Sequence, residues 1–135
     1  QARDLGIGHR VQFTGIIGRD DVARYVAAFD IALQPAVVSY ASPLKLFEYL
    51  ALGKAIVGPD QPNIREILQA DYNAVLFDPD VPGGLAGAVK RLCDDTALRG
   101  KVAHNARATI DEQQLTWGAN ARRAVNLFEG LLKRA

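Results

Sequence analysis

One stretch of the chain, from Ser42 to Asp60 (SPLKLFEYLALGKAIVGPD), predicts a helix, a sharp turn and a buried strand in direct succession. Ser42 is a suitable N-cap residue and Pro43 suits the first helical position, so we expect the helix to begin at Pro43. Gly53 stands where a left-handed helix end commonly occurs. The run Ala55 to Val57 is apolar and mostly β-branched, which is typical of a strand buried on both faces.

The predicted helix combines an apolar face with one carboxylate, Glu48. Its apolar positions recur at helical spacing: Leu44, Phe47, Leu50 and Ala51. The unpaired N–H groups and the positive dipole end at a helix start favour an anion such as phosphate. Two interpretations of Glu48 stay open. It either forms a weak i,i+3 ion pair with Lys45 or accepts hydrogen bonds from a polyol such as ribose.

These residues resemble the donor-binding segment of the group 1 (family 4) glycosyltransferases, which have the two-domain GT-B fold. That family carries a Glu-x7-Glu motif leading into a helix, followed by a Gly-(Lys)-Pro-Val-Val strand. Glu48 matches the second Glu, so the resemblance implies that it binds the ribose of a nucleotide. Tyr40 stands where the family has its first Glu, although a subset of the family has Ser-Pro-x-Lys-x-Phe-Glu-Tyr at this place.

The resemblance implies a partial C-terminal, donor-binding domain of a retaining glycosyltransferase of hexosyltransferase type, acting in cell-envelope or polysaccharide biosynthesis. The donor is then a nucleotide-diphosphate sugar, with no metal or other cofactor. The implied diphosphate- or sugar-binding residues are Tyr40, Ser42, Pro43, Leu44 and Lys45. The implied base-binding residues are Ile16 and Ile17, in the loop after the first expected strand. The acceptor domain, on the N-terminal side, is an expected partner missing from this chain, so we expect the isolated chain to be inactive.

Two other functions remain open on the sequence. One is a non-catalytic α/β binding or assembly module, in which Lys45 and Glu48 form only a surface ion pair. The other is a nucleotide-sugar epimerase of the same fold.

The rest of the chain predicts a Rossmann-like α/β domain with a parallel sheet of about four strands and helices on both faces. The expected strands are 11–15, 31–33, 55–57 and 74–77. We expect a single domain over 1–135, in which residues 115–135 form a C-terminal return helix with Trp117 and Phe128 on its apolar side. The chain begins at Gln1 rather than Met, and we take it as a piece of a longer protein.

Several single residues carry weaker expectations. Asn63 is expected to cap a short helix over 64–69 with Glu66 at its third position. Asp78 and Asp80 flank a proline and predict an ordinary turn rather than a metal site. We expect Cys93 to be a reduced thiol, buried or half-buried. His104 is expected to face solvent.

Composition excludes several partner classes. The net charge is +1, from 16 basic and 15 acidic residues, so no broad field favours nucleic acid. No apolar run is long enough to cross a membrane and no signal peptide is recognisable. We therefore expect a cytoplasmic protein, with the inner face of a membrane as an alternative location for the longer parent.

Overall fold

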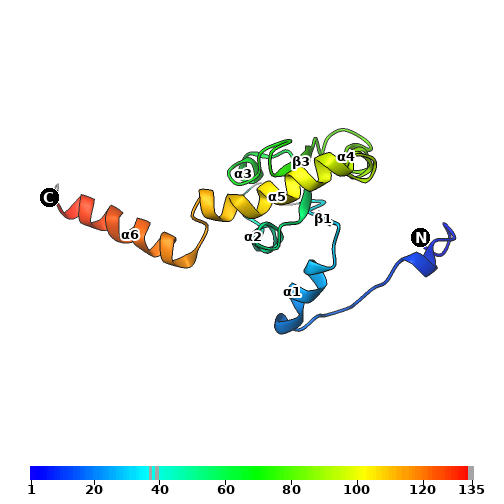
Figure 1. The fold of residues 1–135 in the computed structure, drawn as a ribbon, viewed down its shortest axis with the longest axis horizontal. Helices are drawn as coiled ribbons and strands as arrows, with labels where there is room; N and C mark the ends of the chain where they lie inside the picture. Colours follow the sequence, from blue (N-terminus) through cyan, green and yellow to red (C-terminus); the bar gives the residue numbers. More distant parts are fainter. Residues whose placement is uncertain (37, 39, 134–135) are drawn as a thin grey trace.

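A three-stranded parallel sheet forms the centre of the computed structural model, which describes residues 1–36, 38 and 40–133 (Figure 1). The strands stand in the order β1 (Ile31–Leu33), β2 (Ala55–Pro59) and β3 (Ala74–Phe77). The helices are α1 (Arg19–Ala27), α2 (Leu44–Ala51), α3 (Pro62–Arg65), α4 (Gly84–Asp94), α5 (Thr96–Glu112) and α6 (Trp117–Leu132), with a 3₁₀ turn at Gly8–Arg10.

The helices pack on both faces of the sheet, as predicted. Ile56 of β2 belongs to an apolar cluster shared with α1, α2 and α3, whereas its neighbour Val57 belongs to a second cluster shared with α4. Alternate residues of a strand point to opposite faces, so β2 divides the two clusters. The long helix α5 contributes to both, through Ala106 and Val102 respectively. Because β2 is central and covered on both sides, all five of its residues are buried.

The predicted strand 11–15 is wrong: these residues pair with no strand among the described residues, and the side chain of Phe13 is 88% exposed. A strand needs a hydrogen-bonded neighbour. The described sheet has the order β1-β2-β3, and none of these strands pairs with segment 11–15, so this segment has no ladder to join.

Helix α2 begins one residue later than predicted, at Leu44, with Pro43 as its N-cap in extended conformation and no side-chain cap. The prediction for Gly53 is confirmed, since its φ is +59°, a conformation in which a Cβ would be strained. The predicted core face is wrong in part, because Leu44 is 76% exposed and Ala51 is also exposed. The buried residues are Leu46, Tyr49 and Leu50. Tertiary packing against the sheet and α5 selects this neighbouring face of the helix.

The turn after β2 also differs from the prediction. Helix α3 is Pro62–Arg65, and its N-cap is Gln61 rather than Asn63. Pro62 suits a first helical position because its φ is already helical and its missing N–H is no loss. Glu66, expected at the third position of the helix, instead follows the helix end and is exposed.

The segment from β3 into α4 is a tight turn, as predicted. The N–H of Asp80 donates to Oδ1 of Asp78 at 2.9 Å. A Cβ at Gly84 would lie 2.7 Å from the carbonyl oxygen of Asp78, so only glycine fits the start of α4. Cys93 is exposed, contrary to our expectation, because α4 turns the preceding Leu92 toward the sheet. His104 is exposed on α5, as expected.

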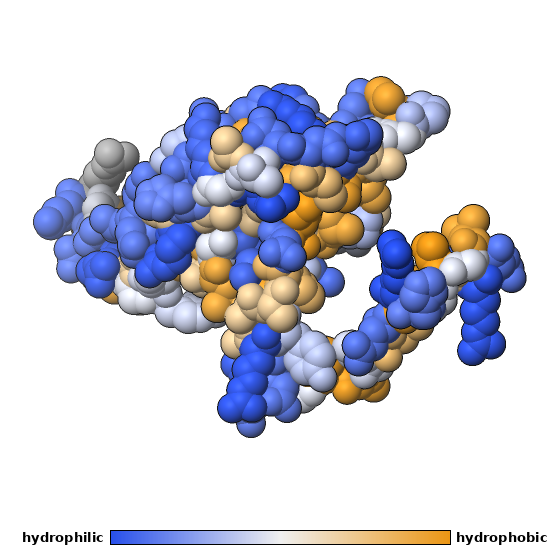
Figure 2. Space-filling model, turned by 45° about the vertical axis from the view of Figure 1, so that its right-hand side comes forward, coloured by the Kyte–Doolittle hydropathy of each residue, from blue (hydrophilic) through white to orange (hydrophobic). Residues whose placement is uncertain are grey.

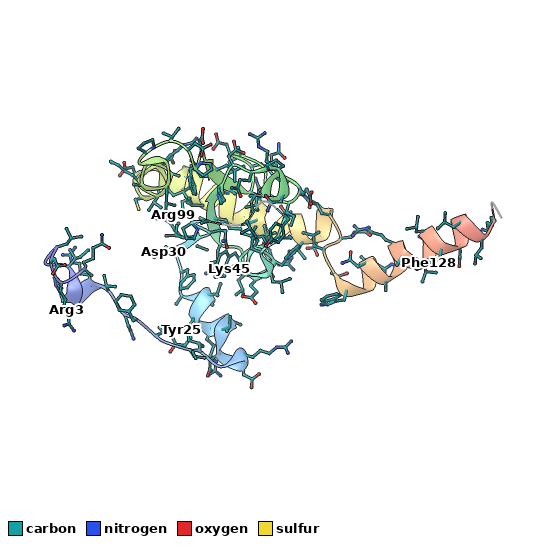
Figure 3. All side chains as sticks on the ribbon, turned by 180° about the vertical axis from the view of Figure 1, so that it is seen from behind. Arg3, Tyr25, Asp30, Lys45, Arg99 and Phe128 are labelled. Atoms are coloured by element: carbon teal, nitrogen blue, oxygen red, sulfur yellow. The ribbon has the colours of Figure 1, made fainter. Side chains whose placement is uncertain are left out.

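Both ends of the described chain extend away from the sheet (Figure 1). Ala119 is the one residue of α6 that is buried. Figure 3 shows Phe128 on α6, well apart from the sheet, and this side chain is 63% exposed. The apolar side of this helix therefore has no cover from the described residues. Among those residues, no helix combines the length and the hydrophobicity that a membrane crossing requires.

Candidate functional site

A cleft of 340 Å³ lies between α1 and α2, and Glu48 is one of its lining residues. Glu48 is exposed, and it stands one helical turn after Leu44 and one before Leu52, on the side of α2 that turns away from the core. The other lining residues are Arg19, Val22, Ala23, Val26, Ala51 and Leu52. The ribose-binding residue implied by the sequence therefore does stand in a hollow of the surface.

The cleft has mostly apolar walls and two charged side chains. Val22 and Val26 come from the inner side of α1, while Arg19 begins that helix and Glu48 comes from α2. A carboxylate accepts hydrogen bonds from hydroxyl groups, and a guanidinium donates to phosphate or carbonyl oxygens. The cleft therefore offers one charged acceptor and one charged donor to a small polar molecule. Sequence reasoning missed Arg19, which follows Gly18 at a helix start and carries no motif of its own.

The start of α2 offers free backbone donors. The N–H groups of Leu44 and Lys45 make no backbone hydrogen bond among the described residues, whereas the N–H of Leu46 donates to the carbonyl of Pro43 at 3.0 Å. Ser42 and Lys45 are exposed, and Pro43 is half-buried. Tyr40 is 88% exposed, so it does not cover the edge of the core. These residues together form an open, donor-rich tip at the carboxyl end of the sheet.

Lys45 and Glu48 do not form the surface ion pair that one interpretation of the sequence required. Within the described ranges, no contact of 4.0 Å or less joins the Lys45 ammonium to the Glu48 carboxylate. Both groups are therefore available to a ligand. The neighbouring Tyr49 points into the core, and burial, followed by the charge of Glu48, raises the pKa of its hydroxyl. Tyr49 stays protonated and packs edge-on against Phe29, with ring centres 6.4 Å apart.

The two implied base-binding residues are not brought to Glu48. Ile16 is fully exposed and Ile17 is half-buried, and neither lines the cleft between α1 and α2. Both lie in the extended segment that leads into α1, just ahead of Arg19. Arg19 is thus the residue through which this part of the chain reaches the cleft.

A second, larger groove of 970 Å³ lies between β1, β3 and α4 and contains none of the implied site residues. Leu33, Phe77, Leu85 and Val89 are among its lining residues. Hydrophobic surface is visible on the side of the body that faces the N-terminal segment (Figure 2). The described residues contain no group of His, Cys, Asp or Glu side chains with the geometry of a metal site.

Comparison with known proteins shows that the sequence matches a known family. The sequence model described as glycosyl transferases group 1 matches residues 1–95. An uncharacterized glycosyltransferase of Methanocaldococcus jannaschii is 26% identical over 125 residues, which are 93% of this chain and 32% of that protein. The chain therefore spans about a third of the length of this relative.

Solved structures agree in fold. A sucrose-phosphate synthase from Thermosynechococcus elongatus superposes with a TM-score of 0.82 at 22% identity, covering 99% of this chain and 33% of that one. HepE from Anabaena, solved in complex with UDP, also superposes with a TM-score of 0.82 at 22% identity, covering 96% of this chain and 35% of that one. At this level of identity the likeness establishes the fold, and it again covers about a third of each relative.

Proposed function

The chain belongs to the group 1 glycosyl transferases, and on that premise we propose that it is the donor-binding part of a retaining enzyme that takes a sugar from a nucleotide-diphosphate sugar. One observation carries the proposal. The exposed carboxylate of Glu48 lines a cleft one helical turn from the N–H groups of Leu44 and Lys45, which have no backbone partner among the described residues. Acceptor and donors at this separation match a ribose followed by a diphosphate.

In this proposal each group has one role. Glu48 accepts hydrogen bonds from the two ribose hydroxyls. These bonds are strong because the acceptor is charged. The N–H groups of Leu44 and Lys45 donate to the diphosphate, and the Lys45 ammonium adds positive charge. Tyr40 and Ser42 lie near the sugar. Ile16 and Ile17 contact the base when the extended segment before α1 lies against the nucleotide. The charge of the leaving diphosphate is met by protein donors and cations rather than by a metal ion.

The choice of donor is supported by one structural relative. HepE has been solved with UDP and with UDP-glucose, and its fold matches 96% of this chain. We take UDP as the first probe because it contains the ribose and the diphosphate that the proposal requires. GDP and ADP differ from it in the base alone, so they test how strictly the base is selected.

We propose further that the isolated chain binds nucleotide weakly and transfers no sugar. Glycosyl transfer needs an acceptor positioned at the anomeric carbon of the donor sugar and compensation of the charge on the departing diphosphate. The proposal assigns one lysine, Lys45, and a few N–H groups to that purpose. Sugar transfer therefore belongs to the longer parent protein.

The test is a titration of the chain with UDP and with 2′-deoxy-UDP, followed by NMR or calorimetry. We expect Glu48→Gln to weaken UDP binding by about 10-fold or more, since a hydrogen bond to a charged group contributes about 1.5–3 kcal/mol. We also expect the wild-type chain to prefer UDP over the deoxy form, and Glu48→Gln to lose that preference.

Glu129→Gln is the matched control, because Glu129 is an exposed carboxylate on α6, far from the cleft. It should bind both nucleotides as the wild type does. A Glu48→Gln variant that keeps both the affinity and the preference for the 2′-hydroxyl would remove the ribose role of Glu48. Failure of the wild-type chain to bind UDP, GDP and ADP would remove the donor-binding function altogether.

A further inference from the structure

The side chain of Asn63 ties the turn after β2 to the segment that leads into α2. Its amide nitrogen Nδ2 donates to the carbonyl oxygen of Ala41 at 2.6 Å and to that of Val38 at 3.2 Å, which lie 22 and 25 residues earlier in the chain. Among the described residues, no other side chain donates to residues 38 or 40–43. Asn63 is thus the one observed side-chain link between this segment and the body.

This link stands three residues before the helix start. Ala41 precedes Leu44, and Pro43 between them is extended and offers no side-chain cap. Helix starts are usually fixed by a capping side chain, which sets the direction in which the chain enters the first turn. Asn63 caps none of these N–H groups. Its two hydrogen bonds instead hold the backbone at Val38 and Ala41, just ahead of the helix start, to the turn after β2.

Two side-chain oxygens near this link have no partner among the described residues. They are Oδ1 of Asn63 and Oε1 of Gln61, two residues earlier, and both atoms are buried. Gln34, at the end of β1, repeats the pattern: its Nε2 donates to the carbonyl of Ala36 at 2.5 Å while its Oε1 is buried and unpaired. Buried acceptors without a partner are uncommon, and a bound water or a functional constraint is the usual explanation.

We propose that Asn63 is a positioning residue for nucleotide binding, which holds the tip of α2 so that its N–H groups face the diphosphate. The inference rests on the donor-binding function proposed above. It concerns the phosphate end of the ligand alone, since Glu48 takes the ribose end. Loss of the link should therefore weaken the binding of UDP and leave the binding of uridine, which has no phosphate, unchanged.

Two variants test the link. Asn63→Ala removes both hydrogen bonds, and Asn63→Asp keeps the shape but replaces the donating amide with a carboxylate that cannot donate when ionised. We expect either change to lower the affinity for UDP by about 10-fold. A tenfold change in affinity corresponds to about 1.4 kcal/mol, which is typical of the loss of about one hydrogen bond. Uridine affinity should stay within twofold of wild type. Glu48→Gln should instead lower the affinity for UDP and for uridine alike, because both ligands carry the ribose.

Asn105→Ala is the matched control. Asn105 on α5 also donates one side-chain bond to a distant backbone carbonyl, that of Tyr72 at 3.0 Å, and takes no part in the site. UDP titrations should give this variant the wild-type affinity. Amide hydrogen exchange should rise at residues 41–46 in Asn63→Ala and remain at the wild-type level there in Asn105→Ala.

The outcomes separate the two proposals. A wild-type chain that binds no UDP overturns the donor-binding function, and the positioning role falls with it. Wild-type binding together with unchanged UDP affinity in both Asn63 variants overturns the positioning role alone. An equal loss of UDP and uridine affinity in both variants also overturns it, because that result indicates general loosening of the fold.

Discussion

Asp60 and Arg65 close the turn after β2 through a two-point ion pair. Nη2 of Arg65 donates to Oδ2 of Asp60 at 2.6 Å, and Nε of the same guanidinium donates to Oδ1. The hydrogen bonds from Arg65 hold the pKa of the Asp60 carboxyl below its usual range, against an opposing effect of burial. The same pair raises the pKa of Arg65. This turn carries Asn63, so the pair also steadies the residue on which the tip of α2 depends.

The ion pair predicts a pH dependence of stability. The pKa of Asp60 is lower in the folded chain than in the unfolded one, so the pair stabilises the fold above the unfolded value of about 4. That contribution disappears as the pH falls through the lower folded value. Urea unfolding should show a larger deficit for Asp60→Asn at pH 7 than at pH 3. Arg65→Gln should follow the same trend, and a deficit of equal size at both pH values would contradict the prediction.

At the level of elements, buried hydrogen bonds join the turn before β3 to α5. Asn73 is 1% exposed, and its Oδ1 accepts from the N–H of Gln69 at 2.7 Å. Its Nδ2 donates to the hydroxyl of Thr109 at 2.9 Å and to the carbonyl of Ile67 at 3.1 Å. The Thr109 hydroxyl in turn donates to the carbonyl of Asn105 at 2.8 Å. Every member of this chain of bonds is paired, so it fixes how α5 lies on the sheet.

Removing the centre of this network should be costly. Asn73→Ala removes three hydrogen bonds, two of them buried, and we expect it to lower the free energy of unfolding by about 2–4 kcal/mol. Thr109→Val should cost about 1 kcal/mol, and the double variant should cost less than the sum, because the two residues share one bond. Denaturant unfolding of the three variants measures this. A loss below about 1 kcal/mol for Asn73→Ala would contradict the role assigned to the network.

At the level of the whole molecule, the buried core is built from residues 19–115, and both ends of the described chain extend away from it. The apolar clusters draw on all three strands, on α1 to α5 and on the half-buried Leu115. Ala119 alone is buried in α6, while Trp117 is 88% exposed. The free energy that stabilises the fold therefore comes from the central part, since burial of apolar area is its main source.

Shortening the chain should reveal this division. Deletion of residues 117–135 is expected to change the free energy of unfolding by less than about 1 kcal/mol, since it removes one small buried side chain. Thermal unfolding by circular dichroism is the measurement. Deletion from residue 101 onward is the contrasting control, because it removes Val102, Ala106 and Thr109, which are fully buried, and should abolish the cooperative transition. Equal effects of the two deletions would contradict a core confined to 19–115.

The features that could be predicted from the sequence depend on residues close together in the chain. The short apolar runs of β1, β2 and β3, the left-handed Gly53 and the turn at Asp78 are all set by residues within a few positions of one another. Helical periodicity likewise placed α1, α4, α5 and α6. For the site, the residues at the start of α2 and Glu48 followed from one contiguous stretch, and the structure places Glu48 in a cleft.

What the tertiary structure decided involves residues distant in sequence. Segment 11–15 has strand-like residues but no strand beside it, and a ladder cannot form without a neighbour. Arg19 and Glu48 line one cleft, and Asn63 reaches Ala41, because the fold brings α1, α2 and the turn after β2 together. The sequence by itself determined most of the helical segments and the three strands of the sheet, since those preferences are local. Which side chains meet was decided by packing, since that depends on contacts between elements far apart in the chain.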